Sequence, residues 1–274
     1  MTKLTQRLET LGFGTYDAGY NMMLDLRLYT LCENGSDSGF LRFYTWSGRT
    51  LSLGHFEDAS VIDMARALED GVQVVRRPTG GRVVLHGDDL TYAVVVPRGA
   101  GQSPLEAYRM ISECIVRGFT RLGIEVGLER SSACKSDVTR KPCFVSTSRY
   151  EILHRGRKVA GSAQKTGSSA VLQHGSIPLG REYLKVVDYM ASDCKDRARL
   201  RSDIDAATTC IYDLLGSCPA PEEVATALAH GFTERFDLVG RRAHADVLDR
   251  EVTDAPQRLE NGVSGGPRGA DKST

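Results

Sequence analysis

The chain has 274 residues, of which 41% are hydrophobic and 26% charged, so it can bury a full core and is not globally disordered. Its 35 basic residues balance its 35 acidic residues, which argues against a nucleic-acid-binding protein. No apolar run approaches the about 20 residues that span a membrane, and residues 1–15 lack the apolar centre of a signal peptide. We therefore expect a cytoplasmic protein that uses neither nucleic acid nor membrane.

The first part of the chain mixes helices with strands rich in aromatic and branched residues. Asn34-Gly35 provides a helix stop, and Gly71 provides another. In chain order the pattern predicts a helix over 16–33, strands over 40–46 and 51–54, a helix over 59–69, a strand over 72–75, and a hairpin of 83–86 and 90–96 turning at Gly87-Asp88-Asp89.

The next helix is announced by Ser103, Pro104 and Glu106, which supply an N-cap, a first-turn proline and a capping-box glutamate. Residues 129–148 lack periodicity and predict a long loop, and loops of that length are usually functional or mobile. The remaining pattern predicts a strand over 124–128, a hairpin of 149–154 and 157–164 turning at Arg155-Gly156, a strand over 170–177, and helices from 182, clearest over 222–236.

Hairpins mixed with helices, without regular β-α alternation, predict an α+β fold with a mixed or antiparallel sheet and flanking helices. We expect one catalytic domain over residues 1–253, with a helical part from about 182 to 250. Residues 254–274 are rich in Gly, Pro and Ser and are predicted to be a disordered tail.

The cysteines are odd in number and lack a C-x-x-C pair, which argues against a disulfide framework and against a zinc ribbon. We therefore predict no metal site and expect most cysteines to be small buried hydrophobes. The seven are Cys32, Cys114, Cys134, Cys143, Cys194, Cys210 and Cys218.

One candidate binding segment is R-R-P-T-G-G-R-V-V-L-H, residues 76–86. Its glycine pair permits positive φ and close approach of a ligand, and its guanidinium groups suit carboxylate or phosphate. An ordinary turn with solvated arginines is the competing interpretation. The candidate substrate-binding residues here are Arg76, Arg77, Thr79, Gly80, Gly81, Arg82 and His86.

Cys143 lies in the predicted loop, in K-P-C-F, with Arg140, Lys141 and Arg149 near it in sequence. Nearby cations favour the nucleophilic thiolate, although a buried structural cysteine is the alternative. Lys158 opens the strand K-V-A-G-S-A-Q, whose small residues Gly161, Ser162 and Ala163 let a ligand lie against the backbone. Lys158 is either a proton-transfer group or a solvated lysine, and His174 is best interpreted as a satisfied core histidine.

These segments, in this order, resemble the lipoate/octanoate protein ligase and transferase family, which is related to the biotin protein ligases. The resemblance covers about residues 16–240 and includes N-M-M-L-D at 21–25, R-F-Y-T-W at 42–46, L-S-L-G at 51–54, C-F at 143–144, Y-E-I at 150–152, G-R-K-V-A-G-S-A-Q at 156–164 and L-Q-H-G-S-I at 172–177. Lipoate ligases commonly have a third glycine where this chain has Arg82. The chain looks closest to the cysteine-dependent octanoyltransferase branch.

The resemblance implies a class II synthetase-like catalytic domain that moves octanoyl from acyl carrier protein to a lysine of a lipoyl domain. It implies Cys143 as nucleophile, Lys158 as its assistant, and acceptors such as the lipoyl domains of 2-oxoacid dehydrogenases or the glycine cleavage H protein. No cofactor is needed. The alternatives are an ATP- and Mg-dependent lipoate ligase, an amidotransferase between carrier domains, and a non-enzymatic module that binds lipoyl domains. Chain-length preference and oligomeric state stay open.

Overall fold

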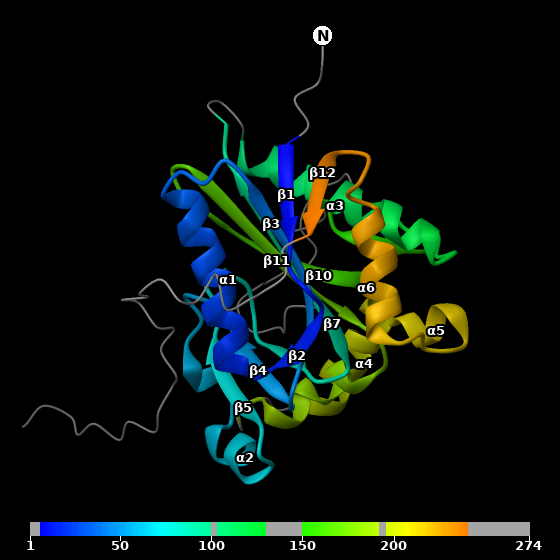
Figure 1. Cartoon of the computed structure of the whole chain (residues 1–274). Coiled ribbons are helices and arrows are strands. Elements are labelled where there is room, and N and C mark those ends of the chain that lie inside the picture. The colour runs from blue at the N-terminus through cyan, green and yellow to red at the C-terminus, as the bar shows by residue number, and fades with distance from the viewer. Residues whose placement is uncertain (1–5, 100–102, 130–149, 192–195, 241–274) are drawn as a thin grey trace, which may run out of the picture.

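A large mixed sheet organises the fold (Figure 1). The computed structural model describes residues 6–99, 103–129, 150–191 and 196–240. Within them the strand order is β12-β1-β3-β7-β11-β10-β9-β8, and β2 pairs with the end of β3. The pairs β1–β12, β1–β3 and β2–β3 are parallel, and the others in this sheet are antiparallel. The strands are β1 Gln6–Thr10, β2 Gly14–Tyr16, β3 Gly39–Trp46, β7 Asp89–Pro97, β8 Gly127–Leu128, β9 Ile152–His154, β10 Arg157–Thr166, β11 Ala170–Pro178 and β12 Phe236–Gly240.

A second, smaller sheet has the order β5-β4-β6. Its strands are β5 Gln73–Arg76, β4 Thr50–Leu53 and β6 Val84–His86. It packs through a separate apolar cluster that includes Leu51, Val187 and Ile204. The helical elements at this cluster are α2 (Met64–Glu69), the 3-10 helix Glu182–Tyr189 and α4 (Arg197–Ala207).

The predicted hairpin of 83–86 and 90–96 is wrong in its pairing. β6 pairs with β4 in the small sheet, whereas β7 pairs with β3 and β11 in the large sheet. The turn between them, at Gly87 with φ of 153°, passes the chain from one sheet to the other. Alternation of side chains is the same for a hairpin and for two strands in different sheets, so it cannot choose the partner.

Helices cover both faces of the large sheet (Figure 1). α1 (Ala18–Glu33) packs on one face, and α3 (Pro104–Arg121) with α6 (Pro221–His230) packs on the other. Successive residues of a strand point to opposite faces. Accordingly, Val94 of β7 belongs to the core beneath α3, while Ala93 and Val95 belong to the core beneath α1.

Helix ends follow the sequence signals closely. The capping box of Ser103 and Glu106 starts α3 as predicted. α1 begins at Ala18, after the N-cap Asp17, and ends at the C-cap Asn34. α3 and α6 cross at backbone contact, because a Cβ on Gly118 would lie 2.5 Å from the Cα of Leu228.

The second predicted hairpin is confirmed. β9 and β10 pair, and β10 pairs in turn with β11. The turn residues Arg155 and Gly156 have φ of 48° and 82°. Positive φ at both central residues is the geometry that two-residue hairpins prefer.

The sequence analysis missed the outer strands β1, β2 and β12. The helix predicted over 222–236 ends at His230, and the chain then enters β12, which lies parallel to β1. These strands are short and half-exposed, so their local pattern is weak. The strand predicted over 124–128 is reduced to β8, and the helix predicted over 59–69 splits into a 3-10 turn and α2. A further short helix, α5, spans Ile211–Leu215.

Most of the predicted loop 129–148, with Cys143, and the predicted tail 254–274 lie outside the described residues. In the ranges that the structure describes, no helix has the length and apolar character that crossing a membrane requires.

Candidate active site

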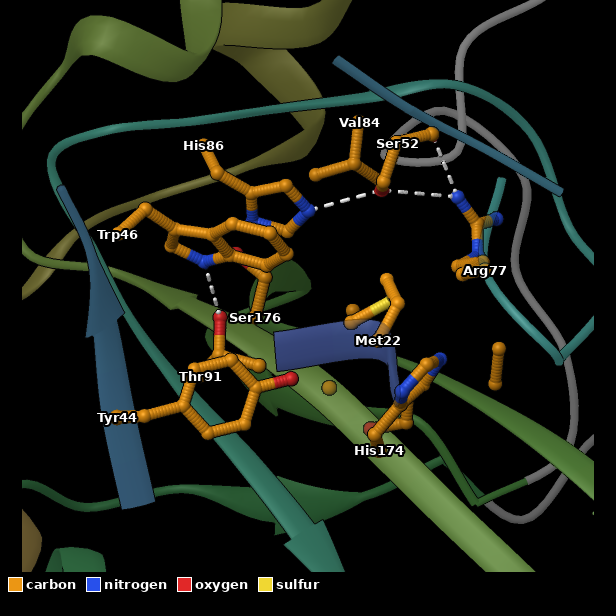
Figure 2. A pocket seen from close by; sticks show the side chains of 14 residues that line it. Met22, Tyr44, Trp46, Ser52, Arg77, Val84, His86, Thr91, His174 and Ser176 are labelled. Atoms are coloured by element: carbon orange, nitrogen blue, oxygen red, sulfur yellow. Dashed lines mark hydrogen bonds between the residues drawn. The ribbon is translucent and has the colours of Figure 1, made fainter. Parts of the chain in front are cut away.

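A cavity lies between the large sheet, the small sheet and α1 (Figure 2). Met22 of α1 projects between the two histidines of its wall (Figure 2). The described residues that line the cavity are Met22, Tyr44, Trp46, Ser52, Arg77, Val84, His86, Thr91, Gly161, Ser162, Ala163, His174, Gly175 and Ser176.

His86 joins the two sheets in one wall of the cavity. Its Nε2 lies 2.8 Å from the Oγ of Ser52 on β4, and its Nδ1 lies 2.8 Å from the Oδ2 of Asp89 on β7. The indole of Trp46 stacks on the imidazole with ring centroids 4.2 Å apart. His86 is therefore fixed by two hydrogen bonds and one stacked ring.

Asp89 collects hydrogen bonds at this corner. Its Oδ2 accepts from the hydroxyls of Thr91 at 3.1 Å and Ser176 at 2.6 Å, and its Oδ1 accepts from the Gly87 amide. Burial alone would raise the pKa of Asp89. The charge and hydrogen bond of His86, together with the bonds from Ser176 and the Gly87 amide, outweigh the effect of burial and place the pKa of Asp89 below its ordinary value. The carboxylate is therefore ionised at neutral pH, and His86 Nδ1 is the donor to it.

His174 forms a second relay on the opposite wall. Its Nδ1 lies 3.1 Å from the Oδ2 of Asp25 on α1, and its Nε2 lies 2.6 Å from the Oγ1 of Thr79. Burial lowers the pKa of His174 below its ordinary value, against the opposing effect of Asp25. Both ring nitrogens are satisfied, as the sequence analysis predicted, but the ring also faces the cavity.

Asp25 anchors this relay in a buried ion pair. The Nη1 of Arg42 lies 3.0 Å from the Oδ1 of Asp25, and both side chains are fully buried. Tyr44 donates its hydroxyl to the Oδ2 of Asp25 at 2.9 Å, and Arg42 also donates to the side chain of Asn21 at 2.6 Å. The network couples α1 to β3 beneath the cavity.

The guanidinium of Arg77 binds the protein itself. Its Nη1 donates to the carbonyl oxygen of Ser52 at 2.7 Å and to the Ser52 Oγ at 3.2 Å. Its Nε donates to the Gly80 carbonyl oxygen, and its Nη2 donates to the carbonyl oxygens of Gly80 and Arg82. A guanidinium has five N–H donors, and these five bonds use them all. Arg77 thus clamps the segment 77–82, which we name the glycine loop, onto β4.

Arg76 and Gly81 hold the R-R-P-T-G-G-R segment against the backbone that follows β4. Arg76 donates from Nη1 to the carbonyl oxygens of Gly54 at 2.7 Å and Glu57 at 2.7 Å. Gly81 has φ of 96°. It packs tightly on Gly54, because a Cβ added to Gly54 would lie 1.9 Å from the carbonyl oxygen of Gly81. Arg76, Thr79, Gly80, Gly81 and Arg82 do not line the cavity, whereas Arg77 and His86 do.

Lys158 is buried, with 2% of its surface exposed, which excludes the solvated alternative. Its Nζ lies 2.5 Å from the Oε2 of Glu151. The backbone at Lys158 is held by Thr209, whose N–H donates to the Lys158 carbonyl oxygen at 2.9 Å. The predicted strand segment Gly161, Ser162 and Ala163 lines the cavity on the same β10, whereas Lys158 is outside the lining.

Cys143, the predicted nucleophile, lies outside the described residues. Cys32, Cys114 and Cys210 are buried, as predicted. Burial raises the pKa of Cys32 to about 12 and that of Cys114 to about 11. Thiols with such pKa values are poor nucleophiles. Cys218 is exposed.

Several cavity residues were not assigned to the site from the sequence. Met22, Tyr44, Trp46, Ser52, Thr91, Gly175 and Ser176 line the cavity, and Asp25 and Asp89 lie behind its histidines. The signal that could have found most of them was present, because the segments 21–25, 42–46, 51–54 and 172–177 carry the family resemblance. Their convergence is a tertiary property.

Solved lipoate protein ligases share this fold. A solved lipoate-protein ligase A bound with ATP superposes with a TM-score of 0.70 at 21% identity, covering 89% of this chain and 91% of that chain. A bipartite lipoate protein ligase from Thermoplasma acidophilum gives a TM-score of 0.71 at 20% identity, with 88% of each chain covered. These likenesses concern the fold.

Sequence comparison gives the family. Residues 17–233 match the lipoyl protein ligase A/B catalytic domain, and the chain belongs to that family. It is 38% identical over 232 residues to the octanoyltransferase LipM of Exiguobacterium sibiricum, with 81% of this chain and 84% of that protein covered. It is 37% identical over 269 residues to LipM of Kyrpidia tusciae, with 93% of this chain and 94% of that protein covered.

Proposed function

We propose that this protein is an octanoyltransferase of lipoate biosynthesis, an acyltransferase that attaches octanoyl groups to a lysine of lipoyl domains. The observation that carries this function is the identity of 38% and 37% to octanoyltransferases over 81% and 93% of the chain. We propose octanoyl-acyl carrier protein as donor. The proposed acceptors are the lipoyl domains of 2-oxoacid dehydrogenases or the glycine cleavage H protein.

The cavity wall supports transfer from a thioester rather than activation of a free acid. Arg77 is the one permanently charged residue among the described residues that line the cavity, and its five donors bind Ser52, Gly80 and Arg82. A free carboxylate or an adenylate is negatively charged, and a cation with donors to spare would hold it by charge-assisted hydrogen bonds. A neutral thioester needs no such cation, and its acyl chain suits a wall with apolar side chains such as Met22 and Val84.

The proposed reaction has two displacements through Cys143. The Cys143 thiolate attacks the thioester carbonyl, the bond to the carrier sulfur breaks, and that sulfur leaves and takes up a proton. The amine of the target lysine then attacks the acyl-cysteine, an amide forms, and the Cys143 sulfur is released. Conversion of a thioester to an amide is downhill, so neither ATP nor Mg is required.

Lys158 is proposed to stabilise the thiolate and to carry the proton of the incoming amine. Its burial and its pairing with Glu151 support a fixed direction for its amine. The proposed donors to the oxyanion are backbone N–H groups near Cys143 or those of 161–163. In an antiparallel strand alternate N–H groups point to opposite sides, so part of this segment directs its N–H groups away from β11.

The test is an acyl-enzyme experiment without ATP. Incubation with octanoyl-acyl carrier protein is expected to add one octanoyl group to Cys143, seen by peptide mass spectrometry. Cys143→Ser should lose the adduct and the transfer. Cys218→Ser is the matched control, because Cys218 is an exposed cysteine of the described structure, and it should behave as the parent chain.

The other functions give different results in the same assay. A ligase would transfer free octanoate only with ATP and Mg and would tolerate Cys143→Ser. An amidotransferase would form the adduct from an octanoylated lipoyl domain and not from the acyl carrier. A binding module would form no adduct with any donor, and that result would contradict the proposed enzymatic function.

A further inference from the structure

The two Asp–His relays end on the same segment from two sides. His174, held by Asp25, bonds Thr79 of the glycine loop. His86, held by Asp89, bonds Ser52, whose Oγ and carbonyl oxygen accept from Arg77, the clamp of that loop. Two histidines from different strands therefore fix one loop of the cavity.

The glycine loop needs such fixation. Gly80 and Gly81 lose more conformational freedom on ordering than other residues. A loop with an adjacent glycine pair holds one shape only if other groups determine it. Its hydrogen bonds in the described structure include the Arg77 bonds, the Thr79–His174 bond and the backbone bond from the His55 N–H to the Thr79 oxygen at 2.8 Å.

We propose that Asp25–His174–Thr79 and Asp89–His86–Ser52–Arg77 are two positioning relays that hold the glycine loop in the shape that accepts the acyl chain. This inference rests on the proposed octanoyl transfer. It makes Asp25, His174, Asp89 and Ser52 determinants of acyl-donor affinity. They act through Thr79 and Arg77 rather than on the reacting carbonyl.

The geometry of Ser52, His86 and Asp89 also matches that of a hydrolase triad, but two observations favour positioning. Ser52 is 1% exposed, and its Oγ accepts from the Nη1 of Arg77 at 3.2 Å. The hydroxyl thus has both a donor and an imidazole partner within the protein. The relay through Ser52 ends on the guanidinium of Arg77, whose other donors bind backbone carbonyl oxygens.

Substitution of Thr79 gives the most direct test of the first relay. Thr79→Val keeps the shape of the side chain and removes the bond to His174, whereas Thr79→Ser keeps the hydroxyl. We expect Thr79→Val to raise KM for the octanoyl donor about tenfold, the cost of one buried hydrogen bond with an orphaned partner. We expect kcat to change little, because a change in the shape of the loop should weaken binding of the ground state and of the transition state alike.

The design separates positioning from general stability. Thr79→Ser should restore KM. Thr15→Val removes a hydroxyl bond of 2.7 Å to Thr45 outside the cavity and should leave KM unchanged. His174→Gln combined with Thr79→Val should raise KM no more than the larger single change, because both break one relay. Ser52→Ala alone should also raise KM, because it breaks the second relay that ends on the same loop.

Clear results would overturn the inference. A Thr79→Val enzyme with parental KM refutes it, as does independence of the His174 and Thr79 effects. An octanoyl adduct on Ser52 would make that residue a nucleophile rather than a positioning group. If the parent chain transfers no octanoyl at all, the proposed function has failed, which is distinct from failure of the relays.

Discussion

Along β7 and β11, adjacent residues serve two different interiors of the molecule. Beneath α3 and α6 the strands present Leu90, Val94 and Val171 to a largely apolar core. Beneath α1 the same strands present Thr91, His174 and Ser176 to a cavity walled by hydrogen-bonded relays. One face of the sheet supplies stability through buried area, and the other uses part of its buried volume for oriented polar groups.

This contrast predicts where changes are felt. Apolar burial stabilises in proportion to the area removed from water and has no preferred direction. Buried polar groups are costly unless each partner is in place. Substitutions beneath α3 should therefore lower stability and leave kinetics alone, whereas substitutions on the cavity side should change function or leave an unpaired group behind.

The largest expected effect is at Lys158, on β10, the strand whose residues 161–163 line the cavity. Lys158→Met should lower octanoyl transfer by about 10²–10⁴-fold, the usual range for loss of a proton-transfer group. Lys165→Met is the matched control on the same strand. The Nζ of Lys165 lies over the Tyr29 ring, and the transfer rate of this variant should stay within about twofold of the parent rate. Single-turnover rates with octanoyl-acyl carrier protein measure both. Near-parental transfer by Lys158→Met would remove this lysine from the mechanism.

Breaking the ion pair beneath the cavity should come next. Arg42→Met leaves the Asp25 carboxylate buried without its counter-charge, which typically costs about 3–5 kcal/mol of unfolding free energy. Urea denaturation measures the loss. Adding Asp25→Asn should recover part of it. A single variant as stable as the parent would show that Asp25 is not charged in the fold.

The apolar face gives the matching stability test. Ile111 is fully buried beneath α3, and Ile111→Ala should cost about 2–5 kcal/mol through lost burial and the cavity left behind. KM and kcat of the folded fraction should match the parent below the unfolding transition. A changed KM would show that the α3 core is coupled to the acyl cavity and would blur the contrast between the two faces.

The smallest expected effect is a pH dependence of stability that arises from His174, beside the cavity. The pKa of His174 is lowered by burial in the folded chain, so the unfolded chain binds a proton first as pH falls below about 6.5. The stability of the parent should therefore decline from pH 7 toward the lower pKa of the folded state. His174→Gln should show a shallower decline in urea titrations at pH 7 and pH 5. Parallel curves would contradict the neutral buried imidazole.

Local sequence determined much of the fold. The capping box at Ser103, the stop at Asn34-Gly35 and the turn at Arg155-Gly156 are set by neighbouring residues, so they can be read without partners. The small residues 161–163 line the cavity, whereas the glycine pair Gly80-Gly81 lies outside its lining. Motif order also predicted the family, which the match over residues 17–233 confirms.

Tertiary structure decided which surfaces meet. Alternation at 83–96 could not show that β6 and β7 enter different sheets. No local pattern could pair Asp25 with His174 across 149 positions, or direct all five donors of Arg77 to the protein itself. Periodicity is a property of adjacent residues, whereas burial, pairing and hydrogen-bond satisfaction depend on which distant segments exclude water together.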